Sequence, residues 1–413
     1  MSENRKQANE RVARRLVGAE PQLETVHPAG NTVPGLEGKL LLHSGPPLDW
    51  EEMIDPLQGA LIGATLYEGW AETEQEAVEL LASGEVQTEP NMDHSAAAPL
   101  AGVISPSMPV FVVADQSSGE RVYTNLNEGL GTVLRFGAYD ETVIERLQWM
   151  EETLGPVLQT VLDEHGPVAL DPLIAKAIER GDECHNRNEA ASSLLVDELA
   201  PALLRSEVDR DDAARVLEFV TDNPHSFLNL SIGAAFARLQ AATGIEESTV
   251  VTKVAANGTE FGIQISSIEG KWFTAPAPTP DANFLDGYVS ADAAPVVGDS
   301  LVTEATGLGG FALAGAPAIS EYLGVTADIC LETTEKMDSV AVTAHEKFRI
   351  PQLDGRGTPV GINAVSVVET GIEPVFNAGI AHRNRGVGQV GAGLAQMPMA
   401  AFERAAEHVE RNE

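Results

Sequence analysis

The signals for helix and strand change twice along this chain, and this change constrains its fold more than any other feature. Between about residues 139 and 245, apolar side chains such as Val143, Leu147 and Leu154 recur at helical spacing, and strand signals are nearly absent. On both sides, strand patterns such as residues 109–113 alternate with helical patterns and glycine-rich turns. The sequence therefore predicts an α+β fold, a mixed α/β body with a helical domain in the middle of the chain. The three predicted domains span residues 1–138, 139–245 and 246–413.

Local signals place several individual elements. Helices are predicted over 49–66 and 73–81, and Gly84 would end the second. Asp140 is a suitable N-cap for the long helix that follows it, which Pro156 should kink or split. In the last third, the pattern favours helices over 311–323, 326–344 and 394–409, strands over 259–267, 360–362 and 365–368, and an irregular proline-rich stretch over 274–280.

The charge balance excludes two classes of partner. Lys and Arg number 26 and Asp and Glu number 62, which gives a formal net charge of −36. A nucleic-acid binder needs a basic face, and an anionic membrane would repel this chain. We expect neither partner, and we interpret the acidic surface as an adaptation to a salt-rich cytoplasm, with an ordinary acidic enzyme as the alternative.

Cysteine usage and the N-terminal sequence favour a cytoplasmic location. Cys184 and Cys330 are the only cysteines, and they lie too far apart for a disulfide framework or a CxxC metal site. The charged N-terminus does not look like a signal peptide, and no apolar run is long enough to span a membrane.

The densest group of chemically active side chains lies between two predicted helices. Within residues 181–188 it offers carboxylates, an imidazole, a guanidinium and an amide from Asp182, Glu183, His185, Arg187 and Asn188. Such a run fits a helix start that faces a cleft and holds an anion. The alternative is an exposed loop rich in helix caps. Cys184 on its own is more typical of a small buried residue than of a nucleophile.

Four further segments carry candidate residues. His43 ends a strand before the rigid turn at 44–47. Glycines flank Asn127, Glu128 and Arg135, and Asn257 and Glu260 enclose another turn. Gly309 and Gly310 precede a predicted helix, and His382 and Arg383 precede a glycine run at 386–393. Each segment could bind a ligand through approaching amides or a cation, and each could equally be a turn, a hairpin or a tight helix entry.

Several common motifs are missing or misplaced. The glycine run contains a literal GxGxxG, but it lies about 20 residues from the end of the sequence, so the βαβ unit of a dinucleotide site cannot follow. No Walker A, HExxH or GxSxG motif occurs, and neither does the Ser-x-Arg-Thr-Arg run of ordinary transcarbamoylases. We therefore expect neither a dehydrogenase nor a zinc protease.

Taken together, these segments resemble the YlbE-like family, which has been linked through AllG-type subunits to the oxamate carbamoyltransferase of anaerobic ureide breakdown. The resemblance covers nearly the whole chain. The matching stretches are 8–10, 42–47, 102–110, 126–137, 181–188, 257–262, 274–278, 298–310 and 379–393.

The resemblance implies transfer of a carbamoyl group between oxalurate and phosphate, giving oxamate and carbamoyl phosphate. It implies no redox cofactor or metal, and it implies partner subunits, one of them an FdrA-like, acyl-CoA-synthetase-like protein. On this basis Asp182, Glu183, His185, Arg187 and His43 are candidate catalytic groups for a small anionic substrate. The candidate substrate-binding residues are Arg135, Asn127, Glu128, Asn188, Asn257, Glu260, Gly309, Gly310, His382 and Arg383.

Two other functions remain open at this point. The chain could be a non-catalytic subunit that supports a partner's active site, and it could be a hydrolase or lyase of another amide. In each case we expect a homo- or hetero-oligomer, because apolar segments rich in glycine and proline, such as 312–319, exceed what one helix needs.

Overall fold

The computed structural model describes residues 3–411, and their arrangement is α+β, as the sequence predicts. Helix α1 (Glu3–Gly18) leads into an antiparallel sheet in the order β5-β4-β1-β6. Its strands are β1 Pro21–Pro28, β4 Pro109–Asp115, β5 Arg121–Asn125 and β6 Val168–Ala169. Every residue of β4 is buried, because the strand lies inside the sheet and helix α9 (Leu228–Ala241) covers it.

A smaller unit contains the parallel pair β2 (Leu40–His43) and β3 (Gln87–Pro90), with α2 (Asp55–Tyr67) and α3 (Glu74–Ser83) beside it. Both predicted helices are present. The Thr73 hydroxyl accepts a hydrogen bond from the Glu76 amide, and Gly84 ends α3 in the left-handed conformation. The first helix begins at Asp55 rather than 49, because Pro56 suits the first turn of a helix but not its interior.

The middle of the chain is helical, as predicted, apart from the two-residue strand β6. Its helices are α4 Glu141–Trp149, α5 Gly155–His165, α6 Leu170–Glu179, α7 Glu189–Arg205, α8 Arg210–Asp222 and α9. Asp140 caps α4 by accepting from the Val143 amide, and a π-helical turn separates α4 from the helix that contains Pro156. Both sequence predictions are confirmed, since proline removes one intrahelical hydrogen bond.

The last third returns to mixed structure. One sheet has the order β11-β7-β8-β9 and another β10-β15-β14, and β12 pairs with β13. The strands are β7 Val251–Asn257, β8 Glu260–Ile265, β9 Ile268–Pro276, β10 Asp281–Phe284, β11 Val297–Gly298, β12 Ala341–Ile350, β13 Arg356–Ile362, β14 Val375–Ala381 and β15 Gln389–Gln396. The helices are α10 Val302–Ala305, α11 Ser320–Leu323, α12 Ala327–Met337, α13 Ala364–Thr370 and α14 Met399–Arg411.

Several local predictions in this third are wrong. Residues 365–368 form part of helix α13 instead of a strand, because Asn363 caps it and Gly371 ends it. Residues 341–344 belong to strand β12, and 311–319 form three short 3-10 turns instead of one helix. The last helix starts at Met399, after strand β15. The strand β9 also extends to Pro276, which is tolerated because β9 is an edge strand.

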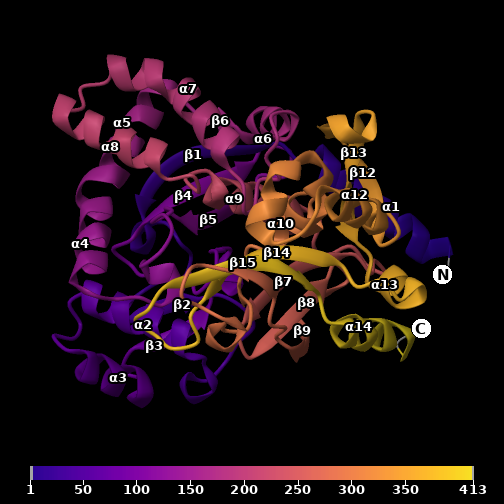
Figure 1. Cartoon of the computed structure of the whole chain (residues 1–413), viewed down its shortest axis with the longest axis horizontal. Helices are drawn as coiled ribbons and strands as arrows, with labels where there is room; N and C mark the ends of the chain where they lie inside the picture. The colour runs from indigo at the N-terminus through magenta and orange to yellow at the C-terminus, as the bar shows by residue number, and fades with distance from the viewer. Residues whose placement is uncertain (1–2, 412–413) are drawn as a thin grey trace.

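The largest hydrophobic core draws residues from all three parts of the chain, including Leu16, Phe236, Phe348 and Phe402. Helices α7 and α8 lie at one end of the molecule and α13 and α14 at the other (Figure 1). None of the helices within residues 3–411 combines the length and apolar character that a bilayer crossing requires. The domain boundaries at 138/139 and 245/246 stay predictions.

Candidate active site

Three segments that are distant in sequence meet at His185, in the loop between α6 and α7. The His185 Nδ1 lies 2.8 Å from Oε1 of Glu304 on α10, and both side chains are buried. Glu304 is itself fixed, because it accepts hydrogen bonds from the Thr303 hydroxyl and the Gly310 amide. A carboxylate only accepts, so Nδ1 of His185 carries a proton and Nε2 is left for other partners.

The carboxylate of Glu183 holds this loop in shape. It accepts from the backbone amides of His185 and Arg187, both at 2.6 Å. Burial raises the pKa of Glu183 to about 7. Between Glu183 and His185, Cys184 adopts a left-handed backbone (φ 59°), which is strained for a residue other than glycine. Burial also raises the pKa of the Cys184 thiol well above its ordinary value, so this cysteine is not an activated nucleophile.

Neighbouring charges favour the imidazolium form of His185. Burial alone would lower its pKa, but the Glu304 carboxylate and its hydrogen bond raise it, and Glu183 adds to this effect. The net direction is upward. His185 can therefore hold a proton near neutral pH, which a general acid requires.

Gly309 allows this arrangement to close. A Cβ added there would meet Glu304 Oε1 at 2.1 Å and His185 Nδ1 at 3.0 Å, and the backbone is left-handed (φ +55°). The neighbouring Gly310 packs as tightly, since an added Cβ would lie 2.2 Å from the Val375 carbonyl oxygen. Both glycines therefore serve close packing around Glu304, and a role for them in binding substrate stays a prediction.

Arg135 is a buried cation with no carboxylate against it. Its Nε and Nη2 donate to the Gly129 carbonyl oxygen at 3.0 and 2.6 Å. The side chain of Glu128 instead accepts from the backbone amides of Leu134 and Arg135. Within residues 3–411, no Asp or Glu reaches the Arg135 guanidinium at ion-pair distance. Burial lowers the pKa of Arg135 to about 10, so the side chain remains charged at neutral pH.

The structure adds a second histidine, His225, that the sequence analysis did not select. It is buried in the turn between α8 and α9, and its Nδ1 lies 3.4 Å from Arg135 Nη2. Arginine only donates, so Nδ1 accepts and the ring proton is on Nε2. Burial, followed by the charge of Arg135, lowers the pKa of His225 to about 3. His225 is therefore a neutral acceptor that orients Arg135.

These groups line one narrow cavity. Its accessible volume is about 10 Å³, close to the need of a single water molecule. Asn186 Nδ2 is buried at this wall and has no hydrogen-bond partner. The polar cavity, as we call it, is lined by Pro99, Leu100, Arg135, Phe136, His185, Asn186, His225, Leu228, Ser300, Ala378, Gly379 and Gln389.

The rest of the predicted catalytic loop surrounds His185 without lining the polar cavity. Asp182 accepts from the Ala191 amide at the start of α7, and the Arg187 side chain lies 3.4 Å from it. That side chain is 29% exposed and also pairs with Glu189. Asn188 donates to the His185 carbonyl oxygen at 2.6 Å. These residues fix the loop, and their direct participation in catalysis stays a prediction.

Asn127 supports the loop that carries Arg135. Its amide donates to Asn229 on α9 at 2.8 Å, and its oxygen accepts from the Gly129 amide and from Asn223. The predicted segment 125–137 is thus tied to the helical part of the chain by buried amides.

The remaining predicted residues lie elsewhere. His43 is buried, with Nδ1 2.9 Å from its neighbour's carbonyl oxygen, and Asn257 donates to the Pro46 carbonyl oxygen. Glu260 is the first residue of β8 and accepts from the Thr274 hydroxyl. His382 and Arg383 lie in the hairpin between β14 and β15, where Asp292 faces both.

One residue connects the His43 turn to the polar cavity. Asp299 accepts from the amides of Gly45 and Ala98 and from Asn91, and the next residue, Ser300, lines the cavity. Burial raises the pKa of Asp299 to about 6.

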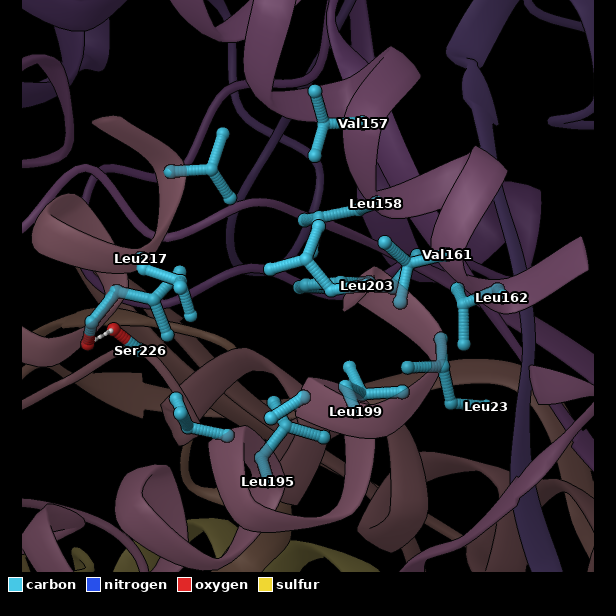
Figure 2. A pocket seen from close by; sticks show the side chains of 15 residues that line it. Leu23, Val157, Leu158, Val161, Leu162, Leu195, Leu199, Leu203, Leu217 and Ser226 are labelled. Atoms are coloured by element: carbon cyan, nitrogen blue, oxygen red, sulfur yellow. Dashed lines mark hydrogen bonds between the residues drawn. The ribbon is translucent and has the colours of Figure 1, made fainter. Parts of the chain in front are cut away.

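A larger cavity lies within the helical region and is chemically different. The apolar cavity, as we call it, has a volume of about 60 Å³ and is lined by side chains of α5, α7 and α8 (Figure 2). Leu23 of β1 and Phe111 of β4 also line it. Fourteen of its 15 lining residues are apolar, and the exception, Ser226, donates to backbone carbonyls. It offers no group that could carry chemistry.

Sequence reasoning selected His185 and Arg135 but not their partners Glu304 and His225, nor the cavity-lining residues Asn186 and Gln389. Three of these four lay inside segments already noted, at 181–188, 298–310 and 386–393. His225 lay in the short polar turn between two predicted helices, which was the one available signal. No set of three or more His, Cys, Asp or Glu side chains within residues 3–411 is placed to hold a metal ion.

Comparisons with known proteins agree over nearly the full length. The model of the family "Oxamate carbamoyltransferase subunit AllG" matches residues 86–300. The chain is 41% identical to that subunit from Escherichia coli K12, over 97% of this chain and 96% of the relative. It is 39% identical to the uncharacterized protein YahG of the same organism, over 96% of this chain and 84% of the relative. A crystal structure of a conserved protein of unknown function from Enterococcus faecalis V583 superposes with a TM-score of 0.97 at 38% identity, covering 99% and 98% of the two chains.

Proposed function

This chain belongs to the family of AllG, the oxamate carbamoyltransferase subunit, and from this membership we propose that it carries a carbamoyl-transfer site. The reaction moves a carbamoyl group between oxalurate and phosphate, giving oxamate and carbamoyl phosphate. One observation carries the proposal: His185, paired with the buried Glu304, lines a cavity inside this chain. Histidines whose pKa is shifted by a specific charged partner beside a cavity are candidates for functional sites.

The chemistry requires a proton to move. A phosphate oxygen attacks the terminal carbamoyl carbon of oxalurate, a C–O bond forms, and the C–N bond to the oxamate nitrogen breaks. Hydrogen phosphate brings one proton, and the departing nitrogen takes up one proton to become the amide of oxamate. Atoms and charge therefore balance without an oxidant, a reductant or a further co-reactant.

His185 suits the transfer of that proton. Nδ1 is held by Glu304, so Nε2 is the nitrogen that can act in the cavity. As imidazolium, His185 would donate the proton on its Nε2 to the leaving nitrogen of oxamate. It would then regain a proton from the phosphate. A general acid in such a position contributes roughly 100- to 10,000-fold in rate.

The test is formation of carbamoyl phosphate from oxalurate and inorganic phosphate, followed by mass spectrometry with the purified chain alone and with its partner subunits. Glu304→Gln should reduce the rate strongly, because the amide no longer favours the imidazolium. Glu189→Gln is the matched control, since Glu189 lies on the surface beside Arg187. Equal rates for both variants would place the chemistry in a partner and leave this chain a non-catalytic subunit.

We also propose that the chain works in a hetero-oligomer in the cytoplasm, with an FdrA-like, acyl-CoA-synthetase-like subunit among its partners. Its two cysteines are both unpaired and buried, which suits a reducing compartment. Co-purification with the tagged chain tests the assembly. A chain that stays monomeric at every concentration and captures no such subunit would contradict it.

We propose separately that the many acidic residues adapt the protein to high salt. With a net charge of −36, mutual repulsion should weaken as ionic strength rises. We expect Tm to rise between roughly 0.1 and 2 M KCl. A flat or falling Tm over that range would give the acidic residues another cause.

A further inference from the structure

We infer that the polar cavity is a binding site for the carboxylate of a small substrate, in which Arg135 Nη1 and Asn186 Nδ2 supply the hydrogen bonds. The inference rests on the proposed function, because it names the group of the substrate that this chain recognises. It stands on hydrogen-bond counting at two buried side chains.

The donors of Arg135 are only partly used. A guanidinium has five N–H groups. Nε–H and one Nη2–H go to the Gly129 carbonyl oxygen, and the second Nη2–H goes to His225. Within the described part of the chain, Nη1 makes no hydrogen bond, so its two N–H groups are free to bind a ligand in the cavity that Arg135 lines.

Asn186 presents the same deficit. Its side chain is 8% exposed, and Nδ2 has no partner, although it lies at the wall of the cavity. A buried donor without an acceptor costs about 1–3 kcal/mol. An unpaired buried donor calls for an explanation, and at a cavity wall one explanation is a ligand that supplies the acceptor.

The charge of the cavity selects the ligand class. Arg135 Nη1 and Asn186 Nδ2 are donors without acceptors, and protonated His185 would add a third donor at Nε2. A ligand that satisfies all of them must bring several acceptors, as a carboxylate does. The cavity is narrow and its walls include Phe136 and Leu100, so a flat carboxylate suits it better than a tetrahedral phosphate. A whole substrate would require the lining side chains to move apart.

His225 acts as a positioning residue in this site. Because it is neutral, it accepts from Arg135 without cancelling the positive charge. A carboxylate at that place would pair with Arg135 and compete with the substrate. The fold therefore fixes the guanidinium by uncharged acceptors on two sides, Gly129 and His225.

The experiment measures anion binding by the full chain, by calorimetry and by thermal shift, with oxamate, acetate and inorganic phosphate as separate probes. We expect oxamate to bind and to raise Tm, and Arg135→Met to weaken that binding by at least about tenfold. Arg205→Met is the control for the change of charge, because Arg205 pairs with Glu164 on the surface. Equal oxamate affinity in both variants would overturn the inference, as would binding of phosphate at Arg135 without oxamate.

A second variant works even if Arg135→Met folds poorly. Asn186→Asp places a carboxylate in the same cavity, so it should occupy Arg135 and abolish the oxamate-dependent rise in Tm while the folded chain persists. A normal oxamate response in Asn186→Asp would overturn the inference.

The two hypotheses fail in different ways. Oxamate binding that depends on Arg135, without carbamoyl phosphate formation by any assembly, would refute the proposed function alone. Normal turnover with KM for oxalurate unchanged in Arg135→Met would refute the carboxylate site alone.

Discussion

The polar and apolar cavities differ in what their walls demand of an occupant. In the polar cavity, Nδ2 of Asn186 is buried without an acceptor, Nη1 of Arg135 makes no hydrogen bond, and His185 lines the same space. In the apolar cavity, leucine and valine side chains surround a larger space and the single hydroxyl is satisfied. The first cavity has donors that an anionic ligand could satisfy, whereas the second gains nothing from a polar ligand.

The two cavities also carry different costs. A void of about 60 Å³ lowers stability by roughly 1–2 kcal/mol, from lost contacts alone. The polar cavity costs stability through the buried unpaired amide of Asn186, at about 1–3 kcal/mol. One larger side chain could fill the apolar void and remove its cost. The cost of the polar cavity could be removed only by replacing the donors that would bind the substrate, and the predictions below test this contrast.

The largest effect should come from His185→Asn. The asparagine amide can still donate to Glu304, but it has no second ring nitrogen that could give up or accept a proton. We expect carbamoyl transfer to fall by about 100-fold or more, with Tm close to that of the parent.

His165→Asn is the matched control, because His165 pairs with Glu198 on the surface at 3.4 Å. It should leave the rate of the assembled enzyme unchanged. Comparable rates for His185→Asn and the control, measured as carbamoyl phosphate formed, would remove His185 from the reaction.

The reverse pattern is expected from Leu162→Ala in the apolar cavity. Leu162 on α5 is 2% exposed, so truncation enlarges a space that already exists. Unfolding in urea should show a loss of about 2–5 kcal/mol, while turnover below the melting transition stays normal. A strong loss of turnover at unchanged stability would mean that this region also serves catalysis.

The pH dependence of stability should reveal His225. Its pKa is about 3 in the folded chain and near 6.5 when unfolded, so the folded state excludes the proton. The stability it contributes is complete above about pH 6.5 and is lost as the pH falls toward 3. Between pH 6.5 and 5 this amounts to at most about 2 kcal/mol.

Glu183 acts in the opposite direction. The pKa of Glu183 is raised to about 7, so the stability that it contributes is complete below the pKa of an unfolded glutamate and is lost as the pH rises through 7.

To isolate His225, the free energy of unfolding in urea is compared between the parent and His225→Gln at pH 5 and pH 6.5. The variant should lose less stability on acidification, and an identical loss would show that His225 is already protonated when folded.

Sequence reasoning found the components of the polar cavity but not their assembly. The run around His185 and the glycine-flanked Arg135 stood out because each places costly polar groups next to apolar helices. Their pairing with Glu304 and His225 depends on contacts across 119 and 90 residues. A local sequence pattern does not show which distant residues come into contact. These two pairs therefore became visible only in the three-dimensional structure.

The helical middle was predicted well for a related reason. Its apolar spacing and its caps are local signals, as Asp140 and Pro156 illustrate. The errors fall where a short apolar run is compatible with both helix and strand. Residues 365–368 are such a run, and the N-cap at Asn363 favours the helix. The apolar cavity itself left no trace in the sequence, because a void depends on how well neighbouring side chains fit.

The smallest effect should come from filling that void with Val161→Ile. Val161 lies on α5 at the cavity wall and is 3% exposed (Figure 2). One added methyl group can gain at most about 0.8 kcal/mol if it enters empty space without moving its neighbours. Urea unfolding should thus show a small increase in stability, with turnover and oxamate binding unchanged, since the polar cavity is lined by other residues. A clear loss of stability would mean that the side chains around Val161 cannot accept a methyl group, and that the apolar cavity is a close-packed region rather than a void.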